Sequence, residues 1–299
     1  MMKTGFIFPG QGVQKPGMGK EIYEEFSEVK KIFNYANDIL GYDLTKIIFE
    51  GPEEELNKTE ITQPAVLVTS IAYFEVSRIK NSELFENCSF VAGHSLGEYT
   101  ALYASCVLDF ESVVNLVRKR AELMADVSKK NPGSMAAIIG FEEETLKNLC
   151  EEISSTAGKV EMANFNTPGQ IVVSGETQAV CELTNRAKEL GATKSVILNV
   201  SGAFHSSFMK QTSEIFAKEI EKFNFSEPKI PVVTNCDAEI TNSSKELKEK
   251  LVKQIYSPVL WQKSIEKMIS EGVDTFVEPG PGKILSAMVR RINKTVKVV

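Results

Sequence analysis

The most constraining feature of this chain is a G-x-S-x-G run, Gly-His-Ser-Leu-Gly at residues 93–97, between a predicted strand and a predicted helix. Residues 90–92 are expected to form the strand and residues 98–107 the helix. Glycines at both ends permit the strained turn that lifts a serine above the edge of a sheet. The pattern therefore predicts an α/β fold that presents Ser95 as a nucleophile. The alternative is an ordinary glycine turn in which the serine only caps the helix.

Two further segments fit the same kind of sheet. Residues 5–8 form a short apolar run, which is followed by a Pro-Gly-Gln-Gly loop and by helical patterning over residues 21–40. Residues 63–80 predict a second, apolar helix with Pro64 in its first turn. Two later segments also predict strands, residues 231–234 and 275–277.

A different pattern occupies residues 128–200, where short apolar runs and amphipathic helices follow the order strand, helix, strand, strand, helix, strand. This βαββαβ order is the signature of a ferredoxin-like unit. The charged run Lys-Lys-Asn-Pro-Gly at residues 129–133 precedes it and predicts a hinge. The expected elements are strands at 135–139, 160–164, 171–174 and 195–200 and helices at 142–153 and 178–190.

The sequence as a whole therefore predicts an α/β protein with two domains. A large α/β-hydrolase-like domain with a parallel sheet is expected over residues 1–128 and 199–299. A smaller ferredoxin-like domain is expected over residues 129–198, inserted into the large one.

Composition narrows the class of protein. Hydrophobic residues make up 42% and charged residues 25% of the 299 positions, which is typical of globular chains and excludes disordered ones. The 34 basic and 40 acidic residues give a net charge of −6, which argues against a general nucleic-acid or anionic-membrane binder. Five scattered cysteines without a CxxC pair indicate a reducing compartment. Because Pro9 and Gly10 interrupt the apolar amino-terminal stretch and no later run approaches a membrane span, we expect a cytoplasmic protein.

A nucleophilic serine needs a base, and the chain offers only two histidines, His94 and His205. His94 is adjacent to Ser95, so its ring is poorly placed to take the serine proton and is expected to pack or hydrogen-bond locally. His205 follows the last predicted strand of the inserted unit, where a loop can present it at the domain junction. We therefore predict His205 as the base, the alternative being a histidine without a catalytic role. Two histidines without an H-E-x-x-H motif argue against a histidine zinc site.

Helical periodicity separates three basic residues in the predicted helix 111–127. Arg120 falls near the centre of an apolar stripe, whereas Arg118 and Lys119 point away from it. A guanidinium on an apolar face needs an anionic partner. That partner is either a structural carboxylate or the carboxylate of a substrate, held by two hydrogen bonds.

Five motifs, spread along the chain, carry a resemblance to a known family. They are G-Q-G-V-Q with G-M (10–14 and 17–18), G-H-S-L-G-E (93–98), the helix with Arg120, N-F-N-T-P-G-Q (164–170) and G-A-F-H (202–205). On these motifs the chain resembles the malonyl-CoA:acyl-carrier-protein transacylases of fatty-acid synthesis, from residue 5 to about residue 290. The ferredoxin-like unit, predicted above from patterning alone, agrees with the small domain of that family.

The resemblance implies an acyltransferase that moves a malonyl group from malonyl-CoA to the phosphopantetheine thiol of acyl carrier protein in a ping-pong reaction. Ser95 would attack the malonyl thioester, and His205 would act first as base and then as acid. The resemblance further implies that the N–H groups of Gln11 and Leu96 form the oxyanion hole. It also implies that the backbone carbonyl of Gln254 orients the histidine, in place of an aspartate.

The same resemblance implies the substrate contacts. Arg120 would clamp the malonyl carboxylate, Phe204 favours malonyl over a branched extender unit, and Lys194 matches a position that contacts the phosphates of coenzyme A. Three residues match polar positions of the pocket, Gln63, Asn166 and Gln170. The expected partners are malonyl-CoA and acyl carrier protein, the acceptor carrying the phosphopantetheine. No bound cofactor, metal, nucleic acid or membrane is expected, and the chain is expected to be a monomer.

Two alternatives stay open at this point, and a third does not fit the residues present. A serine esterase or thioesterase would use the same turn with water as the acceptor, although Arg120 argues against it because lipid esters carry no second carboxylate. A catalytically silent docking subunit would need Ser95 or His205 to be missing, and both are present. A free-standing malonyl acyltransferase of the polyketide type would share every motif named above.

Overall fold

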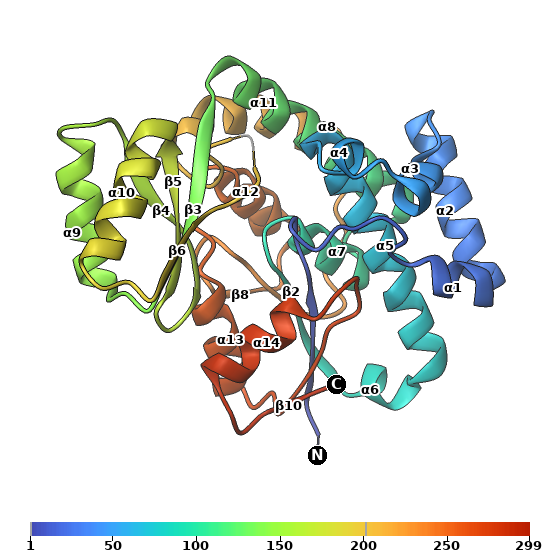
Figure 1. Ribbon diagram of the computed structural model, residues 1–299. Helices are drawn as coiled ribbons and strands as arrows, with labels where there is room; N and C mark the ends of the chain where they lie inside the picture. Colours follow the sequence, from blue (N-terminus) through green and yellow to red (C-terminus); the bar gives the residue numbers. More distant parts are fainter. Residues whose placement is uncertain (1, 201) are drawn as a thin grey trace.

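The protein folds around two separate β-sheets (Figure 1), which a computed structural model describes for residues 2–200 and 202–299. Over these residues the larger sheet has six strands, in the spatial order β10 (Lys297–Val298), β9 (Thr275–Val277), β1 (Thr4–Phe8), β2 (Cys88–Gly93), β7 (Val232–Val233) and β8 (Ile240–Thr241). The smaller sheet has four, in the order β4 (Val160–Thr167), β5 (Gln170–Glu176), β3 (Gly133–Ile139) and β6 (Lys194–Ile197).

Strand β1 is central to the larger sheet. All five of its residues are buried, and β9 and β2 flank it in parallel. Strands β10 and β7 continue the parallel arrangement outward, and β8 pairs antiparallel with β7 at one edge. A parallel sheet of this kind is buried by helices on its faces, and this confirms the α/β class expected for the larger part of the chain.

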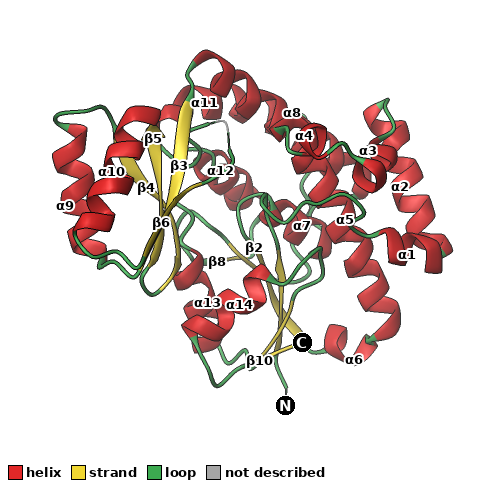
Figure 2. Ribbon diagram, in the orientation of Figure 1, coloured by secondary structure: helices red, strands yellow, loops and turns green. Residues whose placement is uncertain are grey.

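Most helices lie outside the unit formed by the smaller sheet. Figure 2 shows α1 to α5 gathered on the side of the molecule away from that sheet. Those that precede the smaller sheet in sequence are α1 (Lys20–Glu25), α2 (Ser27–Leu40), α3 (Leu44–Glu50), α4 (Glu53–Leu56), α5 (Thr59–Lys80), α6 (Ser82–Glu86), α7 (Gly97–Ala104) and α8 (Phe110–Lys130). Those that follow it are the short 3₁₀ helix Ser207–Met209, α11 (Lys210–Ile220), α12 (Ser244–Gln254), α13 (Trp261–Ser270) and α14 (Ile284–Ile292). No helix among the described residues is both long and apolar enough to span a membrane.

The smaller sheet is antiparallel and has the predicted βαββαβ order, with α9 (Glu143–Ser154) after its first strand and α10 (Thr177–Glu189) after its third. This confirms the ferredoxin-like unit. The last strand ends at Ile197, three residues earlier than expected. The assignment of residues 129–198 to a small domain and of 1–128 and 199–299 to a large one stays a prediction.

Side chains of the smaller sheet point alternately to two different cores. Ala136 and Ile138 of β3 pack in a cluster with α9 and α10, whereas Met135 belongs to the main core of the molecule. Val172 of β5 also belongs to the main core. Because successive side chains of a strand point to opposite faces, the sheet packs one face against its own helices and turns the other toward the main core.

Two helices differ from the sequence prediction in ways that have a physical reason. The helix expected over residues 21–40 is broken at Phe26, whose backbone is extended (φ −116°, ψ 123°). This lets the Phe26 ring pack on the core, with the Lys80 ammonium 4.6 Å from its centroid. The helix expected from residue 63 begins at Thr59, so Pro64 lies inside it instead of in its first turn. The hydroxyl of Thr62 donates to the Leu56 carbonyl and stabilises this extra turn.

The charged run 129–133, which predicts a hinge, is partly helical. Lys129 and Lys130 form the last turn of α8, where positive side chains interact favourably with the helix dipole. The helix ends at Asn131, directly before Pro132, which has no N–H group with which to continue it.

Strand β4 joins the smaller sheet to the segment that precedes α13. The N–H of Phe165 donates to the Val259 carbonyl at 2.9 Å, and the N–H of Val259 donates to the Ala163 carbonyl at 2.9 Å. These bonds hold the edge of the smaller sheet against the segment before α13, and they place Asn164 and Asn166 beside the turn that follows β2.

Candidate active site

Ser95 lies on a tight turn between β2 and α7, at the end of the parallel sheet. Its φ of 52° is in the left-handed region, which is costly for a residue other than glycine. The flanking glycines make the turn possible. A Cβ on Gly93 would lie 1.9 Å from the Gly97 carbonyl carbon, and a Cβ on Gly97 would lie 2.0 Å from the Phe8 carbonyl oxygen. The predicted nucleophile elbow is therefore present.

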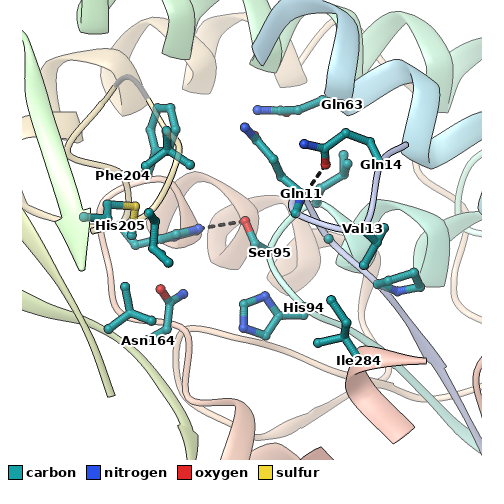
Figure 3. Close-up of a pocket in the computed structure, with 18 of the residues that line it drawn as sticks. Gln11, Val13, Gln14, Gln63, His94, Ser95, Asn164, Phe204, His205 and Ile284 are labelled. Atoms are coloured by element: carbon teal, nitrogen blue, oxygen red, sulfur yellow. Dashed lines mark hydrogen bonds between the residues drawn. The ribbon is translucent and has the colours of Figure 1, made fainter. Parts of the chain in front are cut away.

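Ser95 and His205 form a hydrogen-bonded pair (Figure 3), with 2.7 Å between Ser95 Oγ and His205 Nε2. The other ring nitrogen, Nδ1, lies 3.0 Å from the carbonyl oxygen of Gln254. A carbonyl can only accept, so Nδ1 carries the ring proton and the lone pair of Nε2 faces the serine hydroxyl. The carbonyl of Gln254 thus fixes the orientation of the ring. That His205 acts as a base oriented in this way stays a prediction.

His205 is buried, and its surroundings keep it neutral. Burial lowers the pKa of His205 to about 3, and the positive charge of Arg120 contributes in the same direction. A neutral imidazole is the form that can accept a proton from serine. The backbone of His205 is also left-handed, with a φ of 55°.

Arg120 lies on the inward face of α8 and is 1% exposed. Its Nη1 donates to Gln63 Oε1 at 2.6 Å, and its Nη2 donates to Ser95 Oγ and to Gln254 Oε1, each at 3.1 Å. The guanidinium carbon lies 5.2 Å from the centroid of the Tyr99 ring. Among the described residues no carboxylate forms an ion pair with Arg120, and its Nε has no hydrogen-bond partner. Burial lowers the pKa of Arg120, and Glu98, which shares the Gln254 amide with it, acts electrostatically in the opposite direction from beyond ion-pair distance. The guanidinium is therefore buried without a direct carboxylate contact from the described residues.

Two residues that line the cavity beside Ser95, Leu96 and Gln11, have backbone N–H groups without a hydrogen-bond acceptor in the described chain. The loop with Gln11 lies directly against the elbow, because a Cβ on Gly10 would be 2.4 Å from the His94 carbonyl oxygen. Gln14 stabilises the loop by accepting from the Gly12 N–H at 2.7 Å. This placement is compatible with an oxyanion hole, a role that stays a prediction for both groups.

His94 points away from Ser95 and takes part in the packing of the elbow. Its Nε2 lies 2.9 Å from Asn166 Oδ1, and its ring packs edge-on against Trp261. Burial lowers the pKa of His94, so this ring is neutral as well. The local hydrogen bond expected for His94 is therefore found, and its partner comes from strand β4 of the smaller sheet.

A cavity of about 440 Å³ opens above the Ser95–His205 pair. Most of the predicted site residues line it, namely Gln11, Gln63, Ser95, Leu96, Arg120, Asn166, Phe204 and His205. Gln170 and Lys194 do not line it. Gln170 starts β5 and its side-chain oxygen accepts from Arg291 at 3.0 Å, and Lys194 is an exposed residue at the start of β6. Their implied substrate contacts stay predictions.

The sequence did not predict the buried polar residues that stabilise the elbow by hydrogen bonds. Asn235, in the loop after β7, accepts from the Ser95 N–H and donates to the Gly93 carbonyl, both at 2.7 Å. Its own N–H donates to Glu98 Oε2 at 3.1 Å. Glu98 is completely buried, and burial raises its pKa to about 7. The one available signal was Glu98 itself, the only charged residue in helix α7.

The elbow, the neutral histidine and the parallel sheet define a class of protein, the serine-dependent acyl-transfer enzymes of α/β architecture. The family follows from sequence comparison. A family model described as "Acyl transferase domain" matches residues 5–298. The chain belongs to this family.

Named relatives agree with this assignment. A "Malonyl CoA-acyl carrier protein transacylase" of Bacillus subtilis (strain 168) is 43% identical over 299 residues, covering 100% of this chain and 93% of the relative. A protein of the same name from Staphylococcus aureus (strain MRSA252) is 43% identical over 298 residues, covering 100% and 95%.

Solved structures are similar over nearly the whole chain. An acyl carrier protein S-malonyltransferase from Vibrio cholerae has a TM-score of 0.92 at 38% identity and covers 99% of this chain and 96% of its own. A malonyl-transacylase solved in complex with a type II PKS acyl-carrier protein has a TM-score of 0.94 at 38% identity, covering 99% and 94%.

The low pKa of His205 predicts the pH dependence of serine acylation. A free imidazole with a pKa of about 6.5 would be mostly protonated at about pH 5, and a reaction that needs its neutral form would slow by roughly 30-fold. The pKa of His205 is about 3, so its ring stays neutral over the whole range from pH 8 to about pH 5. Protonation of His205 should therefore not lower the single-turnover acylation rate in this range.

The matched control is Glu98→Gln, because Glu98 is the other buried group of this network that titrates in the same range. An inflection near neutral pH that vanishes in this variant belongs to Glu98. An inflection near pH 6.5 that persists in it would show that His205 titrates normally, contrary to the expectation.

Proposed function

We propose that this protein transfers the malonyl group of malonyl-CoA to the phosphopantetheine thiol of acyl carrier protein through a malonyl-Ser95 intermediate. The observation that carries the proposal is Arg120, a buried guanidinium beside Ser95 Oγ with no carboxylate partner among the described residues. A charge buried in this way is stabilised when a substrate supplies the missing anion. Malonyl-CoA has a free carboxylate two bonds from its thioester carbonyl, which fits a guanidinium placed next to the nucleophile.

The first half-reaction forms the acyl-enzyme. Ser95 Oγ attacks the thioester carbonyl while His205 Nε2 takes its proton, and the carbonyl of Gln254 stabilises the resulting imidazolium through Nδ1. The N–H groups of Leu96 and Gln11 would hold the oxyanion, a contact worth roughly 3 kcal/mol per donor. The tetrahedral intermediate collapses to malonyl-Ser95, the carbon–sulfur bond breaks, and the coenzyme A thiol leaves with the proton held by His205.

The second half-reaction uses the same groups in the opposite direction. The thiol of the carrier's phosphopantetheine gives its proton to His205 and attacks the malonyl ester. The bond between the acyl carbon and Ser95 Oγ breaks, and His205 returns the proton to Ser95 Oγ. A relative's structure was solved in complex with an acyl-carrier protein, which supports a carrier protein as the acceptor. The chain's own cytoplasmic location and monomeric state stay predictions.

The cavity walls support a small, carboxylated acyl group. Phe204 is 5% exposed and lies beside the Ser95–His205 pair, where its ring limits the room for a branch on the acyl chain. Met135 and Val172 of the smaller sheet close the cavity from the opposite domain. No group of three or more His, Cys, Asp or Glu among the described residues could hold a metal ion.

Ser95→Ala should abolish formation of the acyl-enzyme, because the attacking oxygen is missing. The intact mass of the protein after exposure to malonyl-CoA measures this directly, with the unchanged chain as the positive control. The first turnover should release coenzyme A without the carrier, and continued release over many turnovers should depend on holo carrier protein. Equally fast continued release without the carrier would indicate a hydrolase, and a malonyl adduct on Ser95→Ala would remove this serine from the mechanism.

Arg120→Ala should lower serine acylation by malonyl-CoA about 10- to 100-fold while acylation by acetyl-CoA falls much less. A hydrogen bond to a charged group contributes roughly 1.5–3 kcal/mol, and acetyl has no carboxylate to make one. The ratio of the two rates is the measurement. Arg118→Ala is the matched control, because Arg118 lies on the outer face of the same helix and pairs with Glu122 at 3.0 Å. Equal losses for both acyl groups in Arg120→Ala would assign Arg120 a structural role only.

A further inference from the structure

Gln254, the last residue of α12, has a completely buried side chain directly below the elbow. Its Nε2 donates to the Ser95 carbonyl oxygen at 2.9 Å and to Glu98 Oε2 at 3.0 Å. Its Oε1 accepts from Arg120 Nη2 at 3.1 Å. The resemblance explains only the backbone carbonyl of this residue, which orients His205. The side chain makes three further bonds that this role does not need.

The neighbours of this amide permit only one of its two orientations. The carbonyl of Ser95 and the carboxylate of Glu98 are acceptors, and the guanidinium of Arg120 is only a donor. Turning the amide over would place its oxygen against two acceptors and its NH₂ group against a cation. Glu98 therefore helps to determine that the amide oxygen faces Arg120, and the N–H of Asn235 holds the same carboxylate oxygen in place at 3.1 Å.

Arg120 is thus held at both terminal nitrogens by amide oxygens, from Gln63 at Nη1 and from Gln254 at Nη2. An amide oxygen accepts a hydrogen bond but carries no net charge. A carboxylate in either place would neutralise the guanidinium and compete with an incoming anion. Two amides instead fix the position of a long, flexible side chain and leave its charge available.

We propose that the side chain of Gln254, oriented by Glu98, is a positioning residue that holds Arg120 for a carboxylated acyl group and so helps to determine which acyl group is transferred. This inference rests on the proposed function, in which Arg120 binds the malonyl carboxylate. Gln254 contacts no reacting atom through its side chain. Its effect reaches the substrate through the guanidinium, and its backbone carbonyl serves His205 independently of the side chain.

Two variants separate the side chain from the backbone. Gln254→Met keeps the length of the side chain and the backbone carbonyl but removes the hydrogen bonds to Arg120, the Ser95 carbonyl and Glu98. Gln254→Glu keeps the shape, places a negative charge beside the guanidinium and loses the amide donor to the Ser95 carbonyl and Glu98. The measurement is the ratio of the single-turnover acylation rates with malonyl-CoA and acetyl-CoA. We expect this ratio to fall about tenfold in Gln254→Met and about 100-fold in Gln254→Glu.

Matched exchanges on the surface provide the control. Gln262 on α13 is half-buried, lies outside the cavity and bonds to Glu266, so Gln262→Met and Gln262→Glu should keep the ratio of the unchanged chain. Thermal unfolding of each variant shows whether it is folded. If Gln254→Met does not fold, the shape-conserving Gln254→Glu carries the test. The ratio is compared within one variant, so a lower amount of active enzyme does not alter it.

The outcomes distinguish this inference from the function on which it rests. If the unchanged chain forms no malonyl-Ser95, the proposed function fails. If malonyl-Ser95 forms but Arg120→Ala keeps the malonyl-to-acetyl ratio, Arg120 has a structural role only, and this inference is overturned while the proposed transfer stands. If both of those expectations hold but the Gln254 variants lose malonyl and acetyl transfer equally, or lose neither, the side chain is only structural and the inference is overturned.

Discussion

The charge of Arg120, buried beside the nucleophile without a carboxylate partner among the described residues, is the constraint on which the rest of the site depends. Removing an ion from water costs several kcal/mol even after the protein relaxes. The chain offsets part of this cost with amide oxygens from α5 and α12 and with the face of an aromatic ring from α7. None of these partners neutralises the charge. Its field also disfavours a second positive charge nearby, which is one reason why His205 stays a neutral base.

The nucleophile and the base both occupy strained backbone positions, and the structure around them explains how the strain persists. Ser95 and His205 have φ values of 52° and 55°, in a region that costs on the order of 1–3 kcal/mol for such residues. The Asn235 side chain bonds to the backbone of the elbow at two places, the Gly93 carbonyl and the Ser95 N–H. Gln254 holds the elbow through its side chain and the histidine through its carbonyl. The site is therefore preorganised by residues that do not touch a substrate.

Much of this could be predicted from the sequence, because the signals were local. Glycine spacing around Ser95 predicts a turn that no larger residue permits, and the helical period places Arg120 on the buried face of α8. The order of apolar runs predicts the smaller sheet. By contrast, the break at Phe26 accompanies packing against Lys80 of the distant helix α5, which no short window of sequence contains. The extra turn before Pro64 depends on the hydrogen bond from Thr62 to the Leu56 carbonyl, which has no signature in the apolar pattern.

The support of the elbow could not be predicted for the same reason. Asn235 lies 140 positions from Ser95, and its role depends on the fold that brings the two together. The carbonyl that orients His205 has no residue signature at all, since every residue has one. Only a resemblance could point to Gln254, and it pointed to the backbone and not to the side chain.

The most direct test of the account is a crystal structure of the malonyl-Ser95 form, trapped by brief exposure of the protein to malonyl-CoA. The account predicts that the carboxylate of the acyl group lies within hydrogen-bonding distance of the Arg120 guanidinium, with one oxygen at the Nε that lacks a partner among the described residues. Gln63 and Gln254 should still hold the two terminal nitrogens. A malonyl carboxylate that points into solvent, while Arg120 keeps only its protein partners, would contradict the account.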